Sequence, residues 1–105
     1  MDKKLLDYIQ DLSKRDKKTL SQKLSKVFEE GGELARVVLP FESAHACRHR
    51  FVDKNNILEE VSDVILTALS IAYDLDFSHE DIFEMIDEKS QVWQSRQAAE
   101  DDANF

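Results

Sequence analysis

Apolar residues recur at helical spacing through residues 56–75, and this long stripe constrains the fold more than any other feature. Positions three and four residues apart share one face of an α-helix. We therefore predict a helix over about 56–75 that is the most buried element of the protein. The stripe comprises Ile57, Val61, Val64, Ile65, Ala68, Leu69 and Ala72, widened by Leu58, Leu66 and Ile71.

Three further segments show helical spacing, at about residues 2–13, 19–39 and 79–98. The chain has only two Gly and one Pro, too few for a sheet protein with many tight turns. Its 105 residues suffice for one hydrophobic core. We predict an all-α, four-helix-bundle-like single domain over 1–105, with a frayed tail over about 99–105.

The second of these helices has signals at both ends and a glycine on its stripe. Thr19 precedes Gln22 by three residues, the spacing of a capping box. Pro40 disfavours helical geometry in the residue before it, so we expect the helix to end at Leu39. Gly31 on the apolar stripe suggests close approach of another helix. The stripe comprises Leu20, Leu24, Val27, Phe28, Gly31, Leu34, Ala35 and Val38.

Carboxylates gather at two places in this pattern. Glu29, Glu30 and Glu33 lie on the second predicted helix, and Glu60 and Asp63 lie on the third. Neighbours on a helix are three or four residues apart, so all five acids converge if the two helices pack side by side. Acids on the most buried helix are costly unless they are paired or bind a metal. Oxygen ligands of this kind suit Mg²⁺, with Mn²⁺ as an alternative.

Two stretches rich in charged residues lie outside the predicted helices. We interpret the run from Ser13 to Lys18 as a solvated linker or helix end in preference to a phosphate-binding patch. Residues 40–55 form a long irregular segment, and loops of this length are often functional. Its His45, Cys47 and His49 lack a fourth ligand and fit no common zinc framework, which favours loop packing or substrate contact. Its cations either reach a phosphate or neutralise the acids; they are Arg48, Arg50 and Lys54.

The formal net charge of −8 argues against nucleic-acid binding by a broad basic face and against an anionic membrane surface. A small anionic substrate would need metal ions to bridge it to the acids. One cysteine, Cys47, leaves no internal disulfide and fits a reducing compartment. With no signal peptide and no apolar run of about 18 residues, we expect a cytoplasmic protein.

The acids also match a known pattern. Glu29-Glu30-Gly31-Gly32-Glu33 fits EExxE, and Glu60-Val61-Ser62-Asp63 fits ExxD after the 26 intervening residues 34–59. With Lys26-Val27-Phe28 before them, Leu34-Ala35 after, and Lys89 on the last helix, they resemble the MazG-like group of all-α nucleoside triphosphate pyrophosphohydrolases, relatives of dimeric dUTPases. The resemblance covers roughly Leu5 to Arg96.

The resemblance implies Mg²⁺-dependent hydrolysis of (deoxy)nucleoside triphosphates to the monophosphate and pyrophosphate, in nucleotide-pool housecleaning. It implies metal ligation by Glu30, Glu33, Glu60 and Asp63. Glu29 would be a further ligand or would orient the attacking water, and Lys89 would contact phosphate oxygens. It also implies a homodimer or homotetramer in which the neighbour completes the substrate pocket. Further substrate-binding candidates are Lys26, Arg48, Arg50, Lys54 and Trp93, and Trp93, Phe41 and Phe51 are candidates for the pocket or the interface.

Two other function classes fit parts of the sequence. In a non-catalytic helical dimer used for interaction or regulation, the acids would form a solvated face. A di-iron carboxylate bundle would use the Glu-x-x-His spacing of Glu42 and His45, but it requires a second such motif on a regular helix. No motif distinguishes among bases or sugars of a nucleotide substrate.

Overall fold

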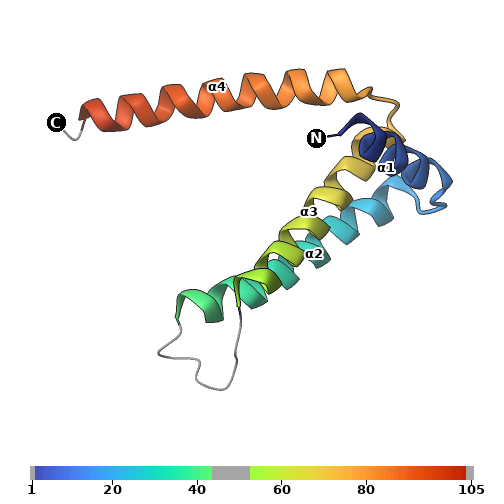
Figure 1. The fold of residues 1–105 in the computed structure, drawn as a ribbon, viewed down its shortest axis with the longest axis horizontal. Coiled ribbons are helices and arrows are strands. Elements are labelled where there is room, and N and C mark those ends of the chain that lie inside the picture. The colour runs from blue at the N-terminus through green and yellow to red at the C-terminus, as the bar shows by residue number, and fades with distance from the viewer. Residues whose placement is uncertain (1, 44–52, 104–105) are drawn as a thin grey trace. The chain divides into compact units, whose positions relative to one another are not determined.

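The computed structural model describes residues 2–43 and 53–103, which contain four α-helices and no strand. The all-α prediction is therefore confirmed for the described residues. The chain divides after Leu75 into two compact units, the first with three helices and the second with one (Figure 1). The helices are α1 (Lys3–Arg15), α2 (Leu20–Glu42), α3 (Lys54–Asp74) and α4 (His79–Ala103).

In the first unit, α2 and α3 lie side by side and α1 packs against α3 near its end (Figure 1). The two long helices are antiparallel. Lys23, near the start of α2, contacts Asp74 at the end of α3. Farther along α2, Glu30 lies beside Glu60 and Asp63, which precede Asp74 on α3.

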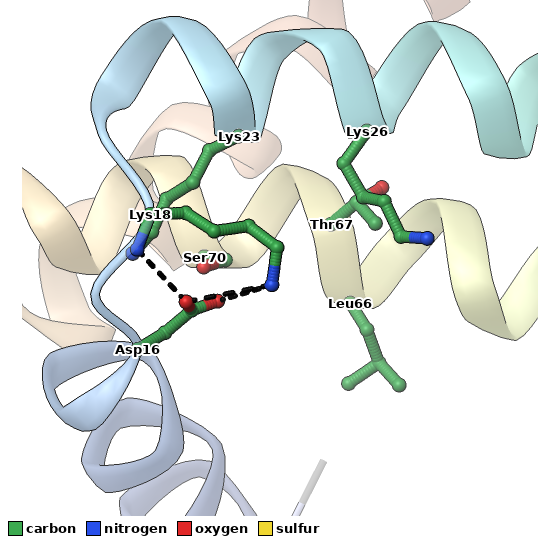
Figure 2. A pocket seen from close by; sticks show the side chains of 7 residues that line it. All are labelled: Asp16, Lys18, Lys23, Lys26, Leu66, Thr67 and Ser70. Carbon is green, nitrogen blue, oxygen red and sulfur yellow. Dashed lines mark hydrogen bonds and ion pairs between the residues drawn. The ribbon is translucent and has the colours of Figure 1, made fainter.

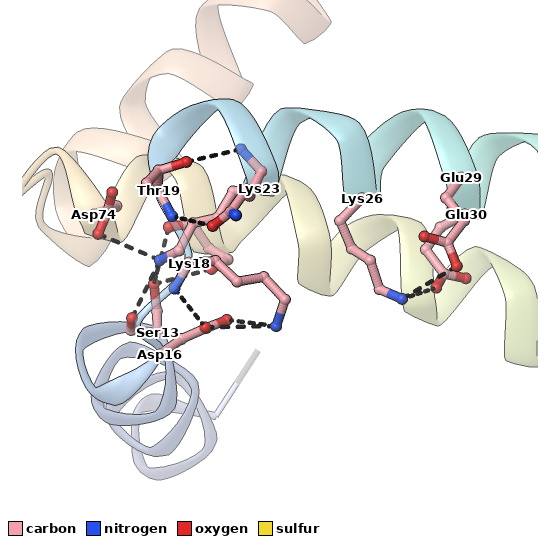
Figure 3. Close-up of polar contacts among 11 residues, drawn as sticks. Ser13, Asp16, Lys18, Thr19, Lys23, Lys26, Glu29, Glu30 and Asp74 are labelled. Atoms are coloured by element: carbon pink, nitrogen blue, oxygen red, sulfur yellow. Dashed lines mark hydrogen bonds and ion pairs between the residues drawn. The ribbon is translucent and has the colours of Figure 1, made fainter.

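A buried ammonium group joins the three helices of this unit (Figure 3). The Lys23 side chain on α2 is 2% exposed, and its Nζ lies 3.3 Å from Oδ1 of Asp74. Nζ also donates to the carbonyl oxygen of Ser13 at 3.1 Å and to its Oγ at 3.2 Å. The Ser13 hydroxyl on α1 in turn donates to the Ser70 carbonyl on α3 at 2.9 Å. All three donors of the ammonium thus have a partner.

The apolar core of the described residues lies beside this junction and is small. Its buried members are Leu6 and Ile9 of α1 and Tyr73 of α3. Burial raises the pKa of the Tyr73 hydroxyl, and the negative charge of Asp7 raises it further. The fully buried apolar side chains of the first unit therefore gather where α1 meets the end of α3.

The predicted apolar stripe of α2 is covered only in part, since Val27, Leu34 and Val38 are half-buried. Leu20, Leu24 and Phe28 are 43%, 50% and 73% exposed. Among the described residues, no atom outside the nearby backbone of α2 lies within 4 Å of the position that a Cβ on Gly31 would occupy, so no other helix of this chain that is described approaches closely there. The charged residues Lys23, Lys26 and Glu30 of α2 are also buried or half-buried, so polar and apolar side chains share the covered side of this helix.

More than half of the residues of α3 are buried or half-buried, a larger share than in the other described helices, but most of this burial is partial. Among the residues of α3, Tyr73 is the one that is fully buried. Leu58, Ile65 and Leu66 of the predicted stripe are exposed. Helical periodicity indicates which face of a helix is apolar, but it does not specify what covers that face.

Two helix ends differ from the predicted ones near residues 39 and 56. Helix α2 continues through Pro40 to Glu42, because Pro40 lies in the last turn and its effect on the preceding residue is a preference only. Helix α3 begins at Lys54, two residues early, because the carboxylate of Asp53 accepts the N–H groups of Asn55 and Asn56 at 2.7 and 3.2 Å.

The remaining ends are set by similar caps. The Thr19 and Gln22 capping box is confirmed, with bonds of 3.2 and 2.9 Å. Helix α1 extends to Arg15, two residues past its expected end. Helix α4 follows a reciprocal pair of hydrogen bonds between Ser78 and Asp81 and extends to Ala103. Within residues 2–43 and 53–103, no helix combines the length and apolar content that a membrane span needs.

Replacing Lys23 with Met should lower the free energy of unfolding by about 2 kcal/mol, because the Ser13 oxygens and Asp74 lose a buried donor. Asp74 is partly exposed and can regain water, which keeps the loss below that of a fully buried pair. Urea denaturation at one protein concentration measures it. Lys17→Met, at an exposed position between α1 and α2, is the control and should change stability little. Equal stability of both variants would contradict the role of the junction.

Candidate functional site

Three carboxylates from α2 and α3 converge in the first unit. Glu30, Glu60 and Asp63 each offer one oxygen, and these oxygens all lie within 4.8 Å of one another. Glu60 and Asp63 are one turn apart on α3, and the antiparallel pairing of the helices brings Glu30 opposite them. The arrangement joins one residue of the first acidic motif to two of the second.

Burial of the three acids is only partial. The side chain of Glu30 is 15% exposed, Glu60 is half-buried, and Asp63 is exposed. The sequence predicts that Glu60 and Asp63 lie on the most buried helix, but most burial on α3 is partial and Asp63 is exposed. The group is therefore accessible from solvent, and the desolvation cost of its charges is smaller than expected.

The acids repel one another in the absence of a cation. Partial desolvation is the largest cause that raises the pKa of Glu60, followed by the negative charges of Asp63, Glu30, Glu33 and Glu59. A divalent cation among these oxygens would relieve the repulsion. Carboxylates alone as protein ligands fit a hard cation such as Mg²⁺ or Mn²⁺.

The other two acids of the first motif have cationic partners on their own helix. Glu29 lies 3.3 Å from Nζ of Lys26, and Glu33 lies 3.3 Å from Nη1 of Arg36. Neither belongs to the three-carboxylate group, although Glu33 contributes to the raised pKa of Glu60. The structure thus brings together three of the four predicted metal ligands.

Lys26 is an internal counter-ion of this site (Figure 3). Its Nζ lies 3.3 Å from Glu29 and 3.4 Å from Glu30. The hydrogen bond to Glu29 is the largest cause that raises the pKa of Lys26, and the contact with Glu30 adds to it. Lys26 therefore links the three-carboxylate group to a motif acid outside it.

A cavity of about 200 Å³ adjoins Lys26 (Figure 2). Its polar lining residues lie in the segment between α1 and α2, on α2 and on α3. The sequence pattern did not indicate Lys23, Thr67 or Ser70 as site residues, and Lys18 lies in the run 13–18 that we interpret as a solvated linker or helix end. Lys23, Lys26 and Glu30 share one helical face, which is the signal that was available. The lining residues are Asp16, Lys18, Lys23, Lys26, Leu66, Thr67 and Ser70.

A second, shallow hollow lies along α3 and is bordered by one acid of the three-carboxylate group. It is lined by Asn55, Leu58, Glu59, Ser62 and Asp63. Asp63 therefore borders this hollow as well as belonging to the three-carboxylate group. Lys54, a predicted substrate-binding residue, is the first residue of α3 and is exposed.

The remaining candidates lie outside this arrangement. Lys89 and Trp93 are exposed residues of α4 in the second unit, which is described by itself. Glu42 ends α2, whereas its proposed di-iron partner His45 falls outside the described residues. The same holds for Cys47, Arg48, His49, Arg50 and Phe51.

Comparison of the chain with protein-family models, curated proteins and solved structures finds no match in any of the three. The function must therefore be inferred from the motifs and from the geometry of the described residues.

Metal-free protein should lose stability as the pH rises above the ordinary Glu60 pKa of 4.5. The folded-state pKa is raised, so protonation favours the fold below 4.5, and this contribution is lost as the pH rises through the folded value. Glu60→Gln should flatten this part of the stability curve, measured by urea denaturation in EDTA. Glu84→Gln on α4 carries the same charge change and should retain the slope. An unchanged slope of stability against pH in Glu60→Gln would contradict the repulsion between Glu60 and the neighbouring acids.

Proposed function

We propose that the chain is a Mg²⁺-dependent pyrophosphohydrolase that converts (deoxy)nucleoside triphosphates to the monophosphate and pyrophosphate. The observation that carries the proposal is the convergence of Glu30, Glu60 and Asp63, whose oxygens lie within 4.8 Å of one another. These residues come from the two motifs that resemble the MazG-like group. The separate halves of that pattern therefore meet at one place.

In this proposal the three carboxylates hold the cation, with Glu33 one turn along α2 as a fourth ligand. Bound Mg²⁺ would supply neutralisation of the triphosphate and activation of water. The protein's own contribution is to fix these oxygens on two paired helices, so that little reorganisation accompanies the reaction.

Glu29 is the candidate for the proton acceptor. It stands outside the three-carboxylate group and is held by Lys26 at 3.3 Å. Unlike Glu33, it is not among the charges that raise the pKa of Glu60, which favours a role in orienting water over direct ligation. Water would attack the α-phosphorus and lose a proton to Glu29 while the bond to the bridging oxygen breaks. Pyrophosphate is then the leaving group, and the monophosphate remains.

We also propose a homodimer or homotetramer, in which the four-helix-bundle-like MazG arrangement is completed between chains. The support is the mismatch between a core of Leu6, Ile9 and Tyr73 and the long apolar stripe exposed on α2. Isolated soluble chains seldom expose a contiguous apolar surface of this kind. Burying it against a second chain would be favourable by roughly 25 cal/mol per Å² of apolar area.

The rival function is a non-catalytic helical oligomer in which the acids are a solvated face, a reading that the exposure of Asp63 favours. Both functions accommodate the exposed stripe on α2. They differ in whether the carboxylates bind a cation and support turnover.

With Mg²⁺ and a panel of nucleoside triphosphates, the wild type should release pyrophosphate. Glu60→Gln should reduce this rate by at least about 100-fold, because it removes a charged ligand from the cation site. Glu59→Gln, at the neighbouring position on α3 but outside the three-carboxylate group, is the matched control and should remain active. Release of orthophosphate alone, or no turnover with any substrate, would overturn the enzymatic proposal and leave the non-catalytic oligomer.

The wild type should have the mass of a dimer or tetramer by size-exclusion chromatography with light scattering. Leu24→Glu combined with Phe28→Glu should shift it toward the monomer, because two charges on the exposed stripe cannot be buried between chains. Lys17→Glu changes the net charge by the same amount and should retain the oligomer. A monomeric wild type would refute the assembly.

A further inference from the structure

The cavity beside the acids concentrates positive charge in a chain whose net charge is −8. Three lysines and one aspartate line it. Lys18 enters from the segment before α2, and Lys23 and Lys26 enter from α2 itself (Figure 2). Its volume of about 200 Å³ accommodates several groups of water size, each of which takes up roughly 30 Å³ in the liquid.

The three lysines differ in their capacity to bind a ligand. The ammonium of Lys23 directs its donors to Ser13 and Asp74, so Lys23 contributes charge but no free donor. Lys18 is 51% exposed and contacts Asp16 at 3.4 Å, longer than the about 2.7–2.9 Å of a strong charged hydrogen bond. Its ammonium can therefore turn from Asp16 to a stronger anion.

Lys26 connects this cavity to the cation site. Its contact with Glu30 at 3.4 Å uses a carboxylate that belongs to the three-carboxylate group. A cation held by Glu30 would compete with Lys26 for that carboxylate and release the ammonium toward the cavity. Lys26 and Glu30 are four residues apart, roughly 6 Å along the helix axis, so an anion bound at the cation site would have only a short distance to reach the cavity.

The hydroxyl groups on the α3 side add little to anion binding. The Thr67 hydroxyl donates to the carbonyl of Val64 at 2.9 Å, and the Ser70 Oγ lies 3.1 Å from the Ser13 Oγ. Phosphate oxygens accept hydrogen bonds and need donors. The hydrogen-bond donors of the cavity that can turn to a bound anion are thus the ammonium groups of Lys18 and Lys26.

We propose that Lys18 and Lys26 form a pyrophosphate subsite, which holds the two terminal phosphates of the substrate beside the cation site of Glu30, Glu60 and Asp63. The assignment to a triphosphate substrate rests on the proposed function. The placement of the two lysines around the cavity does not depend on it.

Binding of inorganic pyrophosphate, measured by titration calorimetry at a fixed excess of Mg²⁺, tests the subsite without turnover. Lys18→Met should weaken binding by about tenfold, the effect of one charge-assisted hydrogen bond, and Lys18→Arg should restore most of it. Lys17→Met is the matched control, because Lys17 is adjacent and exposed but does not line the cavity. It should stay within about twofold of the wild type.

Lys26→Met should have opposite effects on the two ligands. Without pyrophosphate, it should bind Mn²⁺ more tightly than the wild type, because Glu30 loses a competing ammonium; electron paramagnetic resonance of free Mn²⁺ measures this. Pyrophosphate binding in the presence of Mg²⁺ should weaken by about tenfold or more. A lysine with a merely structural role would not change the two affinities in opposite directions.

Two results would overturn the subsite: no binding of pyrophosphate by the wild type, or equal binding by the Lys17→Met and Lys18→Met variants. Either result, together with turnover of nucleoside triphosphates, would leave the proposed function standing. Conversely, lysine-dependent binding of pyrophosphate without turnover of any nucleotide would support the subsite and refute the enzyme. Circular dichroism of each variant checks that the helices are retained.

Discussion

The contact between Lys23 and Asp74 joins the start of α2 to the end of α3. An ammonium that is 2% exposed needs all of its donors satisfied, and Ser13 and Asp74 satisfy them only when α1, α2 and α3 meet at this junction. Following the two antiparallel helices away from it leads to Glu30 on one and to Asp63 and Glu60 on the other. The fixed junction thus brings these carboxylates together.

The pairing of α2 with α3 also explains why charged residues of α2 lie on the side next to α3. Lys26 and Glu30 occupy the side of α2 next to α3, where they neutralise each other at 3.4 Å. The apolar stripe of Leu20, Leu24 and Phe28 is left outside. A chain that buries charge between its helices and exposes leucine and phenylalanine loses much of the stabilisation that apolar burial normally gives. Association of two chains through that stripe would restore this stabilisation, and the acids would remain between α2 and α3 of each chain.

Local signals predicted much of this structure. The helices at Thr19 and Ser78 begin where side chains accept backbone N–H groups, and those interactions act within four residues. The acids were found because EExxE and ExxD place them one turn apart. The orientation of α2 was not predictable, because periodicity shows an apolar face and not the element that covers it. Nor was the role of Lys23, since lysine is rarely buried and its partners are distant in sequence.

The lysine cavity and the acid group are linked by a competition that neither pattern shows alone. Without a cation, Glu30 is held by Lys26, and its charge contributes to the raised pKa of Glu60. In the proposed site, a cation on Glu30 would free the ammonium of Lys26 beside an already positive cavity. Binding of the cation would then favour binding of the anion, and by linkage the anion would favour the cation to the same extent. Such coupling would suit a triphosphate substrate, whose phosphates contact both the cation and the lysine ammonium groups.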